Sequence, residues 1–170
     1  MSRKIDPVTL SVVQGTLRST TKEMTVTMER TCRSPILTMA HDYSNTICDW
    51  VPRIIIQGDD LPAQLGGVAL IVQGMVDYLG EDVHPGDVIY CNDPEMGNTH
   101  LAEMNMFKPV FFEGEIVFWV VQRSHMNDTG GAGAGTMYPD AEEIYSEGFR
   151  FPPIKLYEKG VPNKAMFDIV

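Results

Sequence analysis

The sequence lacks any apolar run long enough to cross a membrane. Its longest run is IVFWVV, residues 116–121, whereas a membrane-spanning helix needs about 20 such residues. The N-terminus, MSRKIDPV, has basic residues but no apolar segment after them, so it does not have the pattern of a secretory signal. We therefore expect a cytoplasmic protein with no membrane partner.

Basic residues are also scarce. The chain has 13 Lys and Arg against 23 Asp and Glu, which gives a formal net charge of -10. A surface that binds nucleic acid needs the opposite sign, so we expect no nucleic-acid partner. The acidic residues are spread along the chain rather than gathered in a tail, which favours solubility.

Cysteines are few, and their spacing excludes two common uses. Cys32, Cys48 and Cys91 are odd in number and far apart. They form neither a disulfide framework nor a Cys-x-x-Cys metal motif. We expect free thiols, mostly buried, in a reducing cytosol.

Two helices are predicted from capping residues and apolar spacing. Asp6 as N-cap and Pro7 at the first helical position predict the start of one helix, which must end by Pro35. A second helix is predicted over residues 68–79, with Gly80 as its stop. The apolar face of the first helix comprises Leu10, Val13, Leu17, Met24 and Met28.

A central hairpin dominates the strand predictions. MNMFKPVFF, residues 104–112, and IVFWVVQRS, residues 116–124, are strand-like and are joined by a turn at Glu113-Gly114. Pro109 predicts a bulge or an edge position in the first strand. Further strands are predicted at RIIIQ, residues 53–57, and at VIYC, residues 88–91, after a type II turn at HPGD. The fold class predicted is α/β, of the α+β kind: a mixed sheet with a central β-hairpin and flanking helices.

The remaining segments are shorter. After the glycine-rich loop at 128–137, PDAEEIYSEG predicts a short helix with Asp140 as N-cap, and residues 149–156 predict an extended segment. Residues 162–170 predict the beginning of another helix. We expect residues 1–170 to form a single domain that is truncated at its C-terminal end.

Two His-x-x-acid pairs raise the question of a shared site. They are His100 with Glu103, and His125 with Asp128. If Glu113-Gly114 is a two-residue turn, both pairs lie at the open end of one hairpin, where paired Cβ atoms are about 5 Å apart. The cross-strand pairs predicted by this register are Glu103 with Ser124, Ala102 with His125, and Thr99 with Asp128.

A metal site is the functional interpretation of this cluster. Imidazole and carboxylate side chains suit Zn²⁺, Mn²⁺ or Fe²⁺, which could polarise a carbonyl or supply a hydroxide nucleophile. Residues three apart point to opposite faces of a regular strand, so His100 and Glu103 can share a metal only across a turn, bulge or helical step. The alternative is that His100 and His125 are ordinary polar residues at loop ends.

Other segments carry weaker signals. Asn92 and Asp93 close a predicted buried strand, where ligand groups often lie, although an Asx-type turn explains them equally well. Asp42, in His-Asp-Tyr, could contribute a base or a ligand, although an ordinary structural role is more common. We count these three residues as candidate substrate-binding residues. The GGAGAG loop fits neither a Walker A motif nor Gly-x-Gly-x-x-Gly and is typical of a flexible loop or a lid.

Several motifs together resemble the hydantoinase B family. They are DPVTLSVVQGTL, QLGGVAL, GDVIYCNDPEMGNTHLAE and SHMNDTGGAGAGTMYPDAEEIYSEGFRFPPIKL. This family covers subunits of ATP-dependent hydantoinases (N-methylhydantoinase among them), 5-oxoprolinases, and acetone and acetophenone carboxylases. Its chains are several times longer, so the resemblance implies the N-terminal part of such a subunit.

The resemblance also implies residue roles. His100, Glu103 and His125 match positions that hold a divalent metal in related ketone carboxylases, with Asp128 as a nearby ligand or catalytic base. The sequence departs from the family pattern in three places: Glu103 replaces aspartate, Met126 replaces a second histidine, and Asn98 replaces a glycine.

The function that this implies is the metal-bearing subunit of a hetero-oligomeric, ATP-dependent complex. A separate hydantoinase A-type subunit would use ATP to activate a carbonyl or cyclic amide substrate, which this subunit then hydrolyses or carboxylates. The alternatives are a non-catalytic structural subunit that has lost the metal, and a stand-alone metal hydrolase.

Overall fold

The chain forms a sheet of antiparallel strands with helices on both faces. The computed structural model describes residues 5–133 and 138–170, without the side chains of residues 63–65. In chain order the elements are α1 (Pro7–Thr31), α2 (Pro35–Thr38), β1 (Tyr43–Asp49), β2 (Ile54–Gln57), η1 (Pro62–Gly67), α3 (Val68–Leu79), β3 (Val88–Cys91), η2 (Pro94–Met96), β4 (Glu103–Phe112), β5 (Glu115–His125), η3 (Ile144–Ser146), β6 (Ile154–Glu158), β7 (Val161–Pro162) and α4 (Lys164–Phe167).

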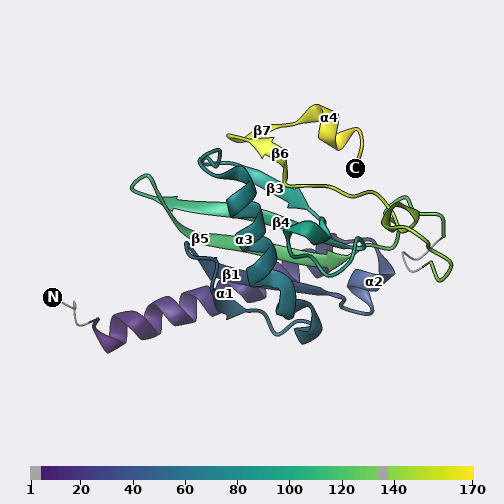
Figure 1. Ribbon diagram of the computed structural model, residues 1–170. Helices are drawn as coiled ribbons and strands as arrows, with labels where there is room; N and C mark the ends of the chain where they lie inside the picture. The colour runs from purple at the N-terminus through teal and green to yellow at the C-terminus, as the bar shows by residue number, and fades with distance from the viewer. Residues whose placement is uncertain (1–4, 134–137) are drawn as a thin grey trace.

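The strand order is β2-β1-β5-β4-β3-β6-β7, and every neighbouring pair is antiparallel. The hairpin β4–β5 lies in the middle of the sheet, and α3 crosses one face of it (Figure 1). The predicted α+β class, with its central hairpin and flanking helices, is confirmed. The predicted mixed sheet is wrong in one respect, because the described strands pair only in the antiparallel sense. No helix in the described ranges is long and apolar enough to cross a membrane.

Helix α1 begins as predicted but is only partly covered. The Asp6 carboxylate accepts a hydrogen bond from the Thr9 N–H and caps the first turn. The second half of the helix packs on the sheet, and the first half extends beyond it (Figure 1). Leu10 and Val13 are therefore 46% and 45% exposed, and the later residues of the predicted apolar face, such as Met24 and Met28, are half-buried.

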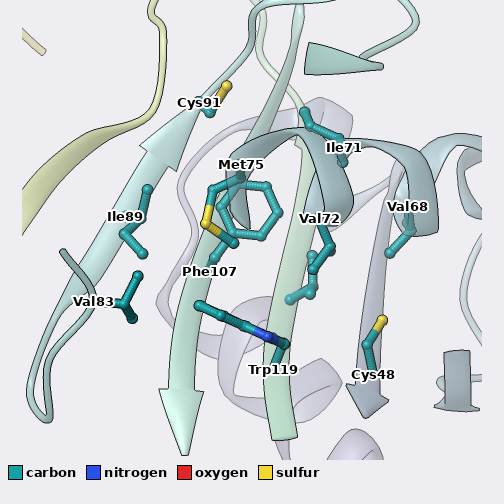
Figure 2. Close-up of a cluster of buried hydrophobic side chains, with 11 residues drawn as sticks. Cys48, Val68, Ile71, Val72, Met75, Val83, Ile89, Cys91, Phe107 and Trp119 are labelled. Carbon is teal, nitrogen blue, oxygen red and sulfur yellow. The ribbon is translucent and has the colours of Figure 1, made fainter. Parts of the chain in front are cut away.

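Helix α3 provides one side of the main core. Its apolar face lies on side chains from β1, β3, β4 and β5 (Figure 2). Burying each large apolar side chain stabilises the fold by roughly 1.5–3 kcal/mol. The helix ends at Gly80 as predicted, with a φ of 55° that favours glycine. Its fully buried residues are Val68, Ile71, Val72 and Met75.

The hairpin turn is the one that the sequence predicts. Glu113 and Gly114 both have positive φ, 50° and 86°, as a two-residue type I′ turn requires. Phe112 pairs with Glu115 on either side of it, which is the predicted register.

Further along the hairpin the predicted register is wrong by one residue. The register shifts between Val110 and Phe111, because β5 has an extra residue, Val117, between the paired residues Ile116 and Phe118. The bulge therefore lies in the second strand, whereas Pro109 predicted it in the first. Beyond this bulge Glu103 pairs with His125, not with Ser124. The two-residue turn could be predicted locally, but the sequence did not show where the extra residue would be inserted.

The segment after the glycine-rich loop also differs from prediction. No helix begins at Asp140; instead the short 3-10 turn η3 follows Glu143. The backbone here is engaged elsewhere, because the Ala132 N–H donates to Ser146 and Gly130 bridges Gly148. Residues 134–137 of the loop lie outside the described residues. The predicted extended segment and the final short helix are present as β6 and α4.

The three cysteines are free thiols, as predicted. Cys48 and Cys91 are fully buried, and burial raises the pKa of each thiol to about 12. Cys32 lies near the surface at the end of α1 and is partly exposed. The reactive species of cysteine is the thiolate, so only Cys32 is placed to react in the folded protein.

We expect a thiol reagent such as DTNB to modify about one cysteine per native chain and all three after unfolding in urea. Absorbance at saturation measures the count. Cys32→Ser should abolish the native reaction, and fast native labelling of that variant would contradict the burial of the other two thiols.

Candidate metal site at the open end of the hairpin

One edge of the sheet brings together side chains from three strand ends. Antiparallel pairing places the start of β4 beside the end of β5, so Glu103 lies opposite His125. The end of β5 also meets the start of β1, because the His125 N–H donates to the Asp42 carbonyl at 3.0 Å. His100 precedes β4, and the centroids of the His100 and His125 rings are 5.2 Å apart.

A turn brings His100 to the same side as Glu103. The Glu103 N–H donates to the His100 carbonyl at 3.2 Å, which closes the turn before β4 begins. The His100 Nε2 consequently lies 3.7 Å from Glu103 Oε1. This is the turn that a shared site requires, since a regular strand would separate the two side chains.

Asp42 joins this cluster through the pairing of β1 with β5. Its Oδ2 lies 3.8 Å from His125 Nδ1. The sequence offered Asp42 as a candidate but contained no local signal that would place it. The long-range strand pairing supplies that placement.

Glu103 forms a buried ion pair that sequence reasoning missed. Its Oε2 contacts Arg123 Nη2 and also accepts a hydrogen bond from the Thr99 hydroxyl. Arg123 is fully buried, and burial lowers its pKa to about 10, so it stays charged at neutral pH. The sequence did contain a signal for this pair, a lone arginine in the strand IVFWVVQRSH. Arg123 is two residues from the apolar Val121, and residues two apart in a strand lie on the same face, which is the buried one here.

The two imidazoles are held toward their neutral form. Burial lowers the pKa of His100 below its ordinary value of 6.5, and the positive charge of Arg123 lowers it further. Burial also lowers the pKa of His125, against the opposing charge of Asp42. Neutral imidazole is the form that binds a metal or accepts a proton.

The other candidates make contacts within the fold. Asp128 Oδ1 accepts the Gly130 N–H at 2.7 Å in a local turn. Asn92 is fully buried; its amide donates to two carbonyls and accepts the Phe151 N–H. Asp93 caps the Glu95 N–H, so the Asx-type turn considered for this motif is present. These contacts hold local backbone segments in place.

The donor chemistry of the cluster fits a divalent transition metal. Two imidazoles and two carboxylates are a set used by Zn²⁺, Mn²⁺ and Fe²⁺. Among the described residues, however, no three His, Cys, Asp or Glu side chains converge as a ready-made metal site. The cluster consists instead of two neighbouring pairs, His100 with Glu103 and His125 with Asp42.

The buried pair gives a testable stability difference. Arg123→Met leaves the Glu103 charge buried without its partner, so we expect a loss of about 3–5 kcal/mol in the free energy of unfolding. The double variant Arg123→Met/Glu103→Leu removes both charges and should be more stable than Arg123→Met alone. Urea denaturation of the three proteins measures this, and an equally unstable double variant would contradict the pairing.

The histidines predict the direction of a pH dependence. A histidine with a lowered pKa in the folded state binds fewer protons there than in the unfolded state, so acid favours unfolding. In the presence of EDTA, the free energy of unfolding should therefore decrease as the pH falls below 6.5. The double variant His100→Gln/His125→Gln should show a smaller decrease over the same range, as measured by urea denaturation at each pH.

Comparison with known proteins identifies the family of this chain. The family model described as Hydantoinase B/oxoprolinase matches residues 6–170. The caprolactamase subunit beta of Pseudomonas jessenii is 45% identical over 166 residues, which cover 98% of this chain and 29% of that subunit. The chain thus spans less than a third of the length of this relative.

Two solved structures share the fold. The crystal structure of the ATP-dependent caprolactamase from Pseudomonas jessenii superposes with a TM-score of 0.90 and 42% identity, over 98% of this chain and 29% of that one. A nucleotide-free acetone carboxylase superposes with a TM-score of 0.88 over 98% and 22%, but at 20% identity it bears on the fold alone. The chain belongs to the hydantoinase B/oxoprolinase family.

Proposed function

We propose that this chain forms the metal-bearing part of a hydantoinase B-type subunit in an ATP-dependent, cytoplasmic hetero-oligomer. The observation that carries the proposal is the meeting of His100, Glu103, His125 and Asp42 at one edge of the sheet. The 45% identity to a caprolactamase subunit beta supports a cyclic amide as the substrate class. The family resemblance also implies a second reaction, the carboxylation of a ketone. Only the similarity of fold to an acetone carboxylase supports that reaction for this chain.

His100, Glu103 and His125 would hold the metal, with Asp42 as a further ligand at the same edge. A bound Zn²⁺, Mn²⁺ or Fe²⁺ would supply Lewis acidity to a carbonyl or lower the pKa of water. The chain contributes neutral imidazoles, because burial lowers the pKa of both histidines. Asp128, at the start of the glycine-rich loop, is the proposed ligand or proton-transfer group, and Asn92 and Asp93 are the proposed substrate contacts.

A hydantoinase A-type partner would use ATP to activate the substrate carbonyl, and the activated substrate would then react at the metal-bearing edge. Two alternatives compete with this scheme. A structural subunit would bind the partner without metal, and a stand-alone metal hydrolase would turn over without ATP. Both alternatives make different predictions for metal content and for ATP dependence.

We expect chelator-washed protein to retain about one Zn, Mn or Fe per chain, measured by ICP-MS. His100→Ala and His125→Ala should each lose it, because each removes a proposed ligand. His84→Ala is the matched control, since His84 lies beside Asp82 in a distant turn, and it should keep the metal.

Metal-free, folded wild type that still binds a hydantoinase A-type partner would favour the structural subunit. Ring opening of a lactam such as caprolactam without ATP or partner would favour the stand-alone hydrolase. Ring opening that needs ATP and the partner, and that is lost in His125→Ala, would support the proposed complex.

A further inference from the structure

The two oxygens of the Glu103 carboxylate have different surroundings. Oε2 is held from two sides, by the Thr99 hydroxyl and by Arg123 Nη2. These two groups also contact each other, since Arg123 Nη2 donates to Thr99 Oγ1 at 2.6 Å. Oε1 instead faces the site, where His100 Nε2 lies 3.7 Å away. The arrangement leaves one carboxylate oxygen directed toward the imidazoles.

Arg123 is a buried charged side chain, and its burial is less favourable than that of an apolar residue. It is fully buried, and its Nε and Nη1 lack hydrogen-bond partners in the described part of the chain. Burying unsatisfied donors and a charge is costly, and an apolar residue of similar size would avoid that cost. The ion pair with Glu103 offsets this cost. The main contribution of Arg123 is therefore to hold the Glu103 carboxylate.

The start of α3 leaves room for the guanidinium. A Cβ at Gly67 would lie 2.8 Å from Arg123 Nη1 and 3.5 Å from Thr99 Cγ2. The φ of Gly67 is -100°, which alanine adopts readily, so the constraint is space rather than backbone conformation. Gly67 therefore offers a way to disturb Arg123 without removing a polar group.

We infer that Arg123 and Thr99 are positioning residues that hold one oxygen of Glu103 and present the other to a divalent metal. This inference rests on the proposed function, because it assumes that Glu103 is a ligand. Hydrogen-bonded groups behind a ligating carboxylate orient it, and their loss typically weakens metal binding 10–100-fold. Oε1 is the oxygen of Glu103 that these contacts leave available.

The test compares Zn²⁺ dissociation constants by competition with a chromophoric chelator. Thr99 is exposed, so Thr99→Val removes the hydroxyl without opening the core. It should weaken Zn²⁺ binding about 10-fold or more. Thr99→Ser is its matched control and should restore tight binding, because it keeps the hydroxyl.

A second pair of variants acts through Arg123. Gly67→Ala should also weaken Zn²⁺ binding, because the new methyl group displaces the guanidinium. Gly66→Ala is its control, since a Cβ there meets nothing within 4 Å, and it should bind as wild type does. Circular dichroism and the melting temperature of each metal-free variant establish that it is folded before binding is measured.

The outcomes separate the two proposals. Tight Zn²⁺ binding by wild type with equal affinity in folded Thr99→Val and Gly67→Ala would overturn the positioning role and leave the metal site standing. No Zn²⁺ binding by folded wild type would overturn both. Weaker binding in these two variants, with wild-type affinity in Thr99→Ser and Gly66→Ala, would support Arg123 and Thr99 as positioning residues.

Discussion

The pairing of β5 with both β1 and β4 is the constraint on which the candidate site depends. These backbone ladders carry Asp42, Glu103 and His125 to one edge of the sheet, although Asp42 is far from the other two in sequence. The bulge at Val117 sets the final register. Directly paired residues share a face, so without that extra residue His125 would point away from Glu103. A backbone irregularity near the turn thus decides the side-chain arrangement at the opposite end.

The face of the sheet under α3 is apolar at one end and polar at the other. Along β5, Trp119 and Val121 pack in the apolar core, and Arg123 and His125 continue the same alternating row at the polar end. The apolar core excludes water from one side of the Glu103–Arg123 pair, which strengthens its electrostatic attraction. The same burial is costly if either partner is lost, so this end of the core tolerates little change in charge.

The proposed function depends on the candidate site more than on the fold. The same architecture superposes on a caprolactamase and on an acetone carboxylase, the latter at only 20% identity. A fold shared at that distance does not specify a reaction. Two features of the local chemistry bear on function. Glu103 is held by Arg123 and Thr99, and Met126 packs against an apolar cluster, at a position where the family resemblance has a second histidine. These details connect the departures from the family pattern to physical contacts.

The sequence by itself determined the features that depend on neighbouring residues. The Asp6 cap, the Gly80 stop and the Glu113-Gly114 turn follow from local backbone preferences and hydrogen bonds, and all three were predicted where they occur. The helix predicted to begin at Asp140 is absent, and long-range contacts explain why. A good capping pattern did not produce a helix there, because the backbone pairs with residues 129–132 instead.

Only the tertiary structure decided how the site is assembled. Local pattern placed His100 and His125 near one hairpin end, but the bulge that sets Glu103 against His125 arises within the packed sheet. The positions of Asp42 and Arg123 depend on contacts with residues distant in sequence. Strand pairing and burial bring together segments that are distant in sequence. Local sequence patterns do not encode which distant segments will pair, so the relative positions of these side chains are set only when the sheet forms.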